Sequence, residues 1–196
     1  MEASSASCLD LGGRKGECNA AIYESAGPQG TKLVRFEHIL GAVEGAMLIG
    51  LPPILGPELL FTLRSMGHGD EIALVDGNYP AQEHARRLIR ADGHGVLELL
   101  AAILPLMPLD DQVEHAMFRA ALNNDPSQAS DFHRAVDDLA ARLVPAFRVA
   151  PLSGDDLYPR IKAAHTVVAT SEPALYGNVI LRKGVVILPQ AAASAL

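Results

Sequence analysis

Residues 57–80 read PELLFTLRSMGHGDEIALVDGNYP, and this stretch decides the class of the fold. Pro57 suits the first turn of a helix, and the leucines that follow it at spacings of three and four residues give that helix one apolar side. Gly67 is placed to end the helix, and a short strand of mostly aliphatic residues is expected at 71–76. Turn-forming residues at 77–80 end the strand. The stretch therefore predicts a helix, a glycine-bounded loop and a strand in direct succession.

The same alternation continues along the chain. Apolar residues with helical spacing alternate with short apolar runs that are typical of strands. This order predicts an α/β fold, in which helices cover a central β-sheet within one compact domain. The expected helices are 96–104, 130–143 and 155–164, and the expected strands are 116–122, 166–170 and 178–181, with a last apolar segment at 185–188.

Composition and charge exclude several classes of protein. The 196 residues carry 16 Lys and Arg against 23 Asp and Glu, a net charge of −7, and the basic residues are scattered, which argues against a nucleic-acid partner. Hydrophobic residues make up 49% of the chain, as in folded domains, yet no apolar stretch reaches the roughly 18 residues of a membrane span. The N-terminus lacks the features of a secretory signal. We therefore expect a cytoplasmic protein with neither a membrane nor nucleic acid among its partners.

The first 46 residues differ from the rest. Most of this segment is rich in small and charged residues without sustained periodicity, and both cysteines, Cys8 and Cys18, lie within it. A disulfide-stapled fold and a cysteine zinc site are thereby excluded from the main body. We expect residues 1–46 to be a disordered extension or a segment that is not native to the protein, and the functional domain to span 47–196.

His68 stands between two glycines, after the first predicted helix and before the first predicted strand. An imidazole titrates near neutral pH, and Asp70 and Asp76 flank the same strand, where they could orient or tune the ring. The glycines let a ligand or another backbone segment approach closely. The pattern fits a catalytic acid or base, and it also fits a histidine in a solvated turn.

A second polar group, Tyr176-Gly177-Asn178, lies between two predicted strands. Tyrosine and asparagine side chains can both donate and accept hydrogen bonds, which is what the recognition of sugar hydroxyls requires. A simple hairpin turn with a tyrosine at its rim fits the same three residues. The sequence alone leaves both interpretations open.

Common cofactor and nucleophile signatures are not found. Gly67-His68-Gly69 lacks the third glycine of a dinucleotide-binding loop, and the chain has no Walker loop, GxSxG elbow or HExxH helix. His84 and His94 lack the spacing of metal ligands on a helix, and His94 is interpreted as a solvent-facing turn residue. Arg90 and Asp92 are interpreted as an ion pair that closes a turn. We therefore expect neither a metal nor a cofactor.

Taken together, ordered motifs spread over residues 47–187 resemble one family, that of the L-fucose mutarotases and D-ribose pyranases. The glycine after His68, an Arg-Ala-Asp-Gly turn and Tyr-Gly-Asn resemble the fucose branch more than the ribose branch. The motifs are PELL at 57–60, GHGDEI at 67–72, Asp76 with YPA at 79–81, IRADG at 89–93, VVAT at 167–170, LYGN at 175–178 and LRKG at 181–184.

The resemblance implies a metal-free, cofactor-free isomerase that interconverts the α and β anomers of a free aldose, with L-fucose as the expected sugar. It also implies a homo-oligomeric ring, typically a decamer, in which subunits build each pocket jointly. D-Ribose pyranase activity, or a non-catalytic sugar-binding or transport-associated role, remain alternatives. The implied proton donor is His68, and the implied substrate-binding residues are Asp76, Tyr158, Tyr176, Gly177 and Asn178.

One position departs from the family pattern. The family usually carries a substrate-binding arginine four residues before the tyrosine that matches Tyr158, and this chain has Gly154 there. Arg148 is the candidate to replace that arginine in space. The departure bears on which sugar is preferred.

Overall fold

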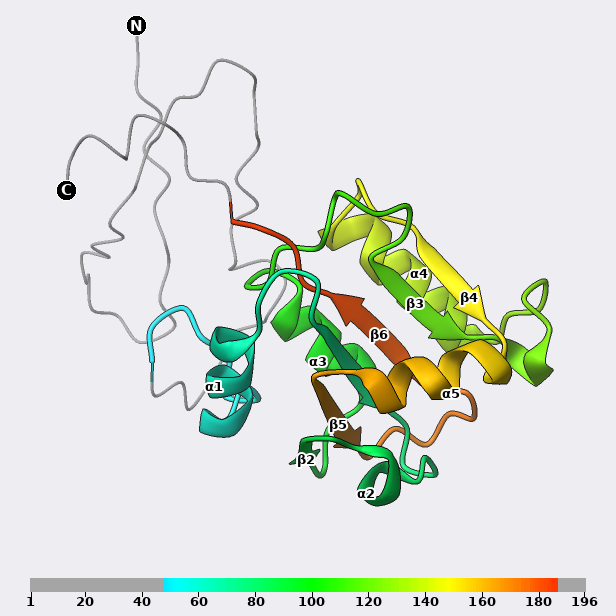
Figure 1. The fold of residues 1–196 in the computed structure, drawn as a ribbon, viewed down its shortest axis with the longest axis horizontal. Coiled ribbons are helices and arrows are strands. Elements are labelled where there is room, and N and C mark those ends of the chain that lie inside the picture. Colours follow the sequence, from blue (N-terminus) through cyan, green and yellow to red (C-terminus); the bar gives the residue numbers. More distant parts are fainter. Residues whose placement is uncertain (1–47, 187–196) are drawn as a thin grey trace, which may run out of the picture. The chain divides into compact units, whose positions relative to one another are not determined.

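The computed structural model describes residues 48–186, and these residues form a six-stranded mixed β-sheet with helices on both faces (Figure 1). The extension expected at 1–46 lies outside the described residues, as does the end of the apolar segment expected at 185–188. The strands lie in the order β2-β5-β1-β6-β3-β4. They are β1 (Glu71–Val75), β2 (Leu88–Ala91), β3 (Met117–Ala120), β4 (Val149–Leu152), β5 (Thr166–Thr170) and β6 (Val179–Arg182).

The helices of this part of the chain begin where the local sequence favours it. Pro57 takes the first position of α1, where a missing backbone N–H removes no helical hydrogen bond. Ser130 caps α4, because its side chain accepts a hydrogen bond from the backbone N–H of His133. The helices are α1 (Pro57–Ser65), α2 (Ala81–His84), α3 (Val96–Ile103), α4 (Asp131–Leu143) and α5 (Gly154–Ala163), and a turn of 3₁₀ helix covers Leu122–Asn124.

Strand β1 lies inside the sheet, between the parallel strand β5 and the antiparallel strand β6. Its residues Ile72, Ala73, Leu74 and Val75 are completely buried, as expected for a strand that is covered on both faces. Side chains alternate between the faces, so Ile72 and Leu74 pack with α1, α3 and α4, whereas Ala73 and Val75 pack with α2 and α5. Figure 1 shows α5 crossing one face of the sheet and α3 and α4 on the other.

The predicted α/β class is confirmed, since helices cover both faces of the sheet. The helices expected at 96–104, 130–143 and 155–164 coincide with α3, α4 and α5 to within one residue at either end, and the strand expected at 166–170 is β5. The strand expected at 116–122 is shorter in the structure, and the one expected at 178–181 is shifted by one residue. Strong periodicity was therefore a reliable guide to the buried elements.

The sequence did not predict strands β2 and β4 or the short helix α2. Both strands lie at the edges of the sheet, where Arg90 and Pro151 interrupt the apolar pattern at little cost. The interpretation of Arg90 and Asp92 as a turn is wrong in part. Their ion pair forms, with Nη2 2.6 Å from Oδ1, but Arg90 belongs to β2.

Candidate active site

A cavity of about 620 Å³ opens at the edge of the sheet where β1, β3 and β4 end and β6 begins. Ligands commonly bind at the carboxyl ends of strands in α/β sheets, because loops from several strands meet there. Four of the residues that the sequence proposed for substrate binding line this cavity, although they come from three separate segments of the chain. They are Asp76, Tyr158, Tyr176 and Asn178.

Asp76 is the buried carboxylate of the cavity. It is 6% exposed and directly follows β1. Its Oδ1 accepts a hydrogen bond from the backbone N–H of Asn78 at 2.9 Å, and its Oδ2 accepts one from the backbone N–H of Gly177 at 3.1 Å. Its own backbone N–H donates to Asn178 Oδ1 at 3.1 Å. The loop of Tyr176, Gly177 and Asn178 is therefore bound to Asp76 and is more than a hairpin turn.

Gly177 has no room for a side chain. A Cβ atom at this position would lie 2.8 Å from the carbonyl oxygen of Ala174, 2.9 Å from Glu172 Cγ and 3.2 Å from Asp76 Cβ. The bare backbone lets the loop approach Asp76 closely enough for the N–H of Gly177 to reach the carboxylate. This residue thus shapes the site although it does not line the cavity.

Aromatic rings form one wall of the cavity. The rings of Tyr79 and Tyr158 have centroids 5.3 Å apart, and the Tyr79 hydroxyl shares a hydrogen bond of 2.9 Å with His84 Nδ1. Burial, and then the neighbouring Tyr158, raise the pKa of Tyr79 to about 12. The Tyr79 hydroxyl therefore stays protonated at neutral pH. The Tyr158 side chain is partly exposed and offers both its ring and its hydroxyl to a ligand.

Tyr176 adopts a backbone conformation that is unusual for a residue with a side chain. Its φ is +59°, in the left-handed region. Its carbonyl oxygen accepts a hydrogen bond from Nε2 of His133 at 3.0 Å, and its hydroxyl lies 3.4 Å from Asn123 Oδ1. The sequence analysis did not single out His133. The signal was present, because positions 133, 136 and 140 share the apolar face of the amphipathic helix α4.

The cavity is acidic and hydrogen-bonding in character. Among residues 48–186, the charged ones that line it are Asp76 and Asp155, and none of the lining residues in this range is Lys, Arg or His. Asn78, Asn124 and Asn178 add amide groups that can both donate and accept. This arrangement suits an uncharged ligand with many hydroxyls better than an anion.

At Gly154, the position that departs from the family pattern, Asn124 occupies the space that a side chain would need. The backbone N–H of Gly154 donates to Asn124 Oδ1 at 2.9 Å, and a Cβ atom on Gly154 would lie 2.9 Å from the same oxygen. Arg148, expected as a replacement for the family arginine, is not among the lining residues. It precedes β4, whereas the cavity lies where β4 ends, so the strand carries it away from the site.

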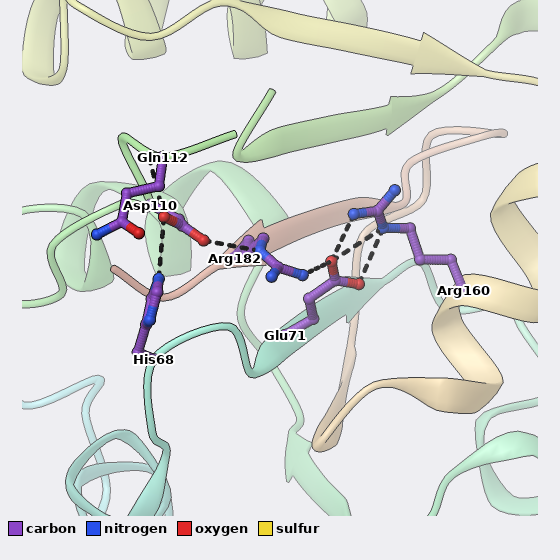
Figure 2. Close-up of polar contacts among 6 residues, drawn as sticks. All are labelled: His68, Glu71, Asp110, Gln112, Arg160 and Arg182. Carbon is purple, nitrogen blue, oxygen red and sulfur yellow. Dashed lines mark hydrogen bonds and ion pairs between the residues drawn. The ribbon is translucent and has the colours of Figure 1, made fainter. Parts of the chain in front are cut away.

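His68 lies at the other end of β1. Its Nε2 is 3.1 Å from Asp110 Oδ1, and the side chain of His68 is 43% exposed while that of Asp110 is 1% exposed. Asp110 also accepts hydrogen bonds from Arg182 Nε at 2.8 Å and from the backbone N–H of Gln112 at 3.1 Å (Figure 2). The bond from Arg182 is the main reason that the pKa of Asp110 falls to about 2, and His68 adds to the effect. A charged carboxylate therefore holds the imidazole.

The contacts continue across this end of the sheet as alternating charges. Arg182 Nη1 lies 3.6 Å from Glu71 Oε1, and Glu71 accepts hydrogen bonds from Arg160 Nε at 2.9 and 3.1 Å. Figure 2 shows His68, Asp110, Arg182, Glu71 and Arg160 in one chain of contacts. Two side chains of α5, those of Tyr158 and Arg160, thus lie toward opposite ends of the sheet. Tyr158 lines the cavity, and Arg160 joins this network.

The expectation that Asp70 and Asp76 orient His68 is wrong for a single copy of the chain. Asp70 accepts a hydrogen bond from the backbone N–H of Gly67 at 2.8 Å, and Asp110 is the carboxylate that contacts the imidazole. Seven residues separate His68 from Asp76, and the five of them that form β1 alone span roughly 16 Å at about 3.3 Å per residue. The structure therefore brings together the proposed substrate-binding residues and leaves the proposed proton donor apart from them.

The described residues hold neither a cluster of metal ligands nor a membrane-spanning helix. Between residues 48 and 186, no group of three or more His, Cys, Asp or Glu side chains is arranged to hold a metal ion. No helix in that part of the chain is both long enough and apolar enough to cross a membrane.

Comparison with known proteins identifies the family of this chain. A sequence profile described as the RbsD / FucU transport protein family matches residues 49–186. The chain belongs to this family. Among its relatives, the human protein named fucose mutarotase is 42% identical over 147 residues, which are 72% of this chain and 96% of the human protein. The L-fucose mutarotase of Haemophilus influenzae (strain 86-028NP) is 41% identical over 143 residues, which are 71% of this chain and 97% of that protein.

A solved structure of this RbsD / FucU family has the same fold. The crystal structure of the fucose mutarotase of Streptococcus pneumoniae in complex with L-fucose superposes with a TM-score of 0.66 at 39% sequence identity. The match covers 71% of this chain and 100% of that one. The family profile, which matches residues 49–186, includes the residues of both the cavity and the His68 network.

Proposed function

We propose that this RbsD / FucU family chain is a mutarotase that interconverts the α and β anomers of a free aldose, with L-fucose as the preferred sugar. One observation carries the proposal: Asp76, Tyr158, Tyr176 and Asn178 line one cavity, to which the described part of the chain contributes no cationic side chain. Two relatives that are 41–42% identical are named fucose mutarotases, and a 39% identical structure holds L-fucose, which supports the choice of sugar. We place the reaction in the cytoplasm.

The bonds already made in the cavity define what remains free for a sugar. Each oxygen of Asp76 accepts one backbone N–H, and a carboxylate has about four acceptor sites, so roughly two remain for sugar hydroxyls. Asn178 uses Oδ1 to accept from the backbone of Asp76, which leaves its NH₂ group to donate. Acceptors and donors thus lie side by side, as a ring of alternating hydroxyl groups requires.

Mutarotation needs a proton delivered to the ring oxygen and another removed from the anomeric hydroxyl, so that the ring opens, rotates and closes. His68 is the proposed proton donor. Its Nε2 faces Asp110, which leaves Nδ1 to exchange a proton with the sugar. Asp76 or a pocket water accepts the proton of the anomeric hydroxyl. This chemistry needs only one imidazole and one carboxylate in reach of the same sugar.

Because a copy's own His68 is separated from its cavity by the length of β1, a second copy supplies the imidazole in this proposal. Opposite charges support such a head-to-tail contact. Asp155 and Asp156 are exposed at the cavity end. A hollow at the His68 end has an excess of positive charge, because its lining holds four arginines against two carboxylates: Arg86, Arg87, Arg160 and Arg182 against Asp70 and Glu71. Heterologous contacts of this kind close into rings when the rotation permits. We propose the homo-oligomeric ring that the resemblance implies, a decamer.

The test is the rate of anomer exchange measured by saturation-transfer NMR with the full chain. We expect accelerated α–β exchange of L-fucose, little acceleration with other free aldoses, and no pyranose–furanose exchange of D-ribose at a comparable rate. Asp76→Asn, which keeps the size of the side chain but removes its charge, should weaken both sugar binding and exchange. Binding of L-fucose in calorimetry without any accelerated exchange would identify a sugar-binding protein and refute the enzymatic proposal.

A further inference from the structure

A buried histidine outside the cavity contacts the sugar-binding loop. His133 lies on α4 with 0% of its surface exposed. Its Nδ1 accepts a hydrogen bond from the backbone N–H of Ser130 at 3.1 Å, and its Nε2 lies 3.0 Å from the carbonyl oxygen of Tyr176. A carbonyl only accepts, so Nε2 carries the hydrogen. The two partners together require the neutral ring with its proton on Nε2.

The bond from His133 acts on a single peptide unit that Asp76 holds from the other side. The carbonyl oxygen of Tyr176 and the N–H of Gly177 belong to the same planar peptide. His133 donates to the oxygen at 3.0 Å, and Asp76 Oδ2 accepts from the N–H at 3.1 Å. Tyr176 itself has φ of +59°, a conformation that a non-glycine residue keeps only when its surroundings enforce it. The orientation of this peptide therefore depends on two side-chain hydrogen bonds, one from His133 and one to Asp76.

We propose that His133 is a positioning residue of the sugar site, which fixes the Tyr176–Gly177 peptide so that Asp76 and the Tyr176 ring meet the sugar in a fixed arrangement. This inference rests on the proposed function. It adds a residue that is about 40 positions away in sequence, does not line the cavity and does not contact the sugar. His133 acts through the loop alone.

The surroundings of His133 keep its ring neutral. Burial is the main cause that lowers the pKa of His133, and the positive charges of Arg119 on β3 and Arg134 on α4 act in the same direction. The bond to the Tyr176 carbonyl and the negative charge of Asp137 on α4 oppose them. Arg119 is itself paired with Asp137 at 3.1 Å. The lowered pKa favours the neutral ring that both hydrogen-bond partners of His133 require.

Two substitutions of His133 distinguish the loss of its hydrogen bond to Tyr176 from a general disturbance of α4. His133→Gln places an amide N–H near the position of Nε2 and keeps a donor for Tyr176. His133→Asn keeps an acceptor near Nδ1 for the Ser130 N–H but is too short to reach Tyr176. In the exchange assay with L-fucose, we expect His133→Asn to raise KM about two- to tenfold, the size of one lost hydrogen bond, with kcat within about twofold. His133→Gln should stay near the wild-type KM.

Ser130→Ala is the matched control, because it removes the side-chain cap of α4 and leaves the Ser130 backbone N–H and the Tyr176 contact in place. It should lower the melting temperature and leave KM unchanged. A wild-type KM in His133→Asn, an equal rise of KM in Ser130→Ala, or an equal loss in His133→Gln would each refute the positioning role.

A readout without activity separates this inference from the proposed function. Nitrogen-15 NMR of the wild-type chain should show His133 as the Nε2–H tautomer at neutral pH. Hydrogen exchange at the Gly177 amide should be faster in His133→Asn than in His133→Gln or Ser130→Ala. If these differences appear while the wild type does not accelerate sugar exchange, the proposed function fails and the positioning role stands. If the amide of Gly177 exchanges equally in all variants, the positioning role is refuted.

Discussion

The two ends of strand β1 hold their carboxylates in different ways. At the carboxyl end, Asp76 is bound by the neutral backbone N–H groups of Asn78 and Gly177. At the amino end, Asp110 is bound by the guanidinium of Arg182 and by the ring of His68. Neutral donors position a carboxylate and leave its charge available to a ligand, whereas a cationic partner compensates that charge. The comparison indicates that one end is built to bind and the other to hold an imidazole.

Removing the imidazole should have the largest effect. We expect His68→Ala to reduce the catalysed exchange of L-fucose anomers about 10²–10⁴-fold, the usual contribution of one general acid. Folding should be unaffected, because the ring of His68 is 43% exposed. Saturation-transfer NMR measures the rate, and thermal unfolding provides the control. An unchanged rate would remove His68 from the mechanism.

Mixing the two impaired variants sharpens the same comparison. If the two ends of β1 serve different sites, His68→Ala and Asp76→Asn chains that assemble together should regain about a quarter of the sites, since random 1:1 mixing joins two intact halves with that frequency in a head-to-tail ring. The mixture is unfolded, refolded and assayed for exchange. Activity that stays at the level of the separate variants would show that both residues act within one copy.

A methyl group at Gly177 should disturb the cavity end alone. In Gly177→Ala the new Cβ would meet the Ala174 carbonyl oxygen at 2.8 Å, so the loop must move away from Asp76. We expect a loss of about 1–3 kcal/mol in the free energy of unfolding, together with a raised KM. Denaturant unfolding and exchange kinetics measure the two effects. Gly56→Ala is the control, because a Cβ atom at this position meets no atom within 4 Å. It should change the free energy of unfolding by no more than about 1 kcal/mol and leave KM unchanged.

Acid should lower the stability of the fold at the His68 end of β1, because Asp110 becomes protonated there. Because the pKa of Asp110 is lowered from 3.8 to about 2, its contribution to stability is complete above about pH 4 and is lost as the pH falls toward 2. The difference in melting temperature between wild type and Asp110→Asn should therefore be largest above pH 4 and shrink toward pH 2.5. Thermal unfolding across this range measures it, and a constant difference would contradict the assignment.

The smallest effect belongs to an exposed ion pair. Arg90 and Asp92 are bound to each other at 2.6 Å, and both side chains are about two-thirds exposed. Surface pairs of this kind are screened by water and contribute little. We expect no measurable change of the melting temperature in Arg90→Ala, in contrast to Arg182→Ala, which leaves the 1%-exposed carboxylate of Asp110 without its guanidinium.

Local patterns allowed much of the fold to be predicted. The apolar faces of α3, α4 and α5 and the buried run of β5 were placed to within one residue, because burial imposes their periodicity. Strands β2 and β4 were missed for the converse reason, since an edge strand tolerates Arg90 and Pro151. The motif Tyr176-Gly177-Asn178 was singled out from its residue types, but its bonds to Asp76 depend on contacts about 100 residues apart, which the sequence does not reveal.

The error about the surroundings of His68 has a geometric cause. Asp76 is near His68 in sequence, but an extended strand separates its two ends by its full length. Asp110 reaches His68 because β6 pairs antiparallel to β1, with Arg182 opposite Glu71, and the backbone N–H of Asp110 donates to the carbonyl oxygen of Arg182. His133 was overlooked because a polar residue on an apolar helix face has no obvious partner in sequence. Its partner, the carbonyl of Tyr176, becomes visible only in the folded chain.

In the proposed ring, the burial of β1 has a mechanical consequence. The strand is completely buried from Ile72 to Val75 and hydrogen-bonded to a neighbouring strand on each side, so we expect it to move as one rigid segment. In this ring, Asp76 at the carboxyl end of β1 binds the sugar of its own subunit, and His68 before the amino end reaches the sugar of the next subunit. A cavity made in the middle of β1, as in Leu74→Ala, would thus loosen the sugar sites of two neighbouring subunits at once.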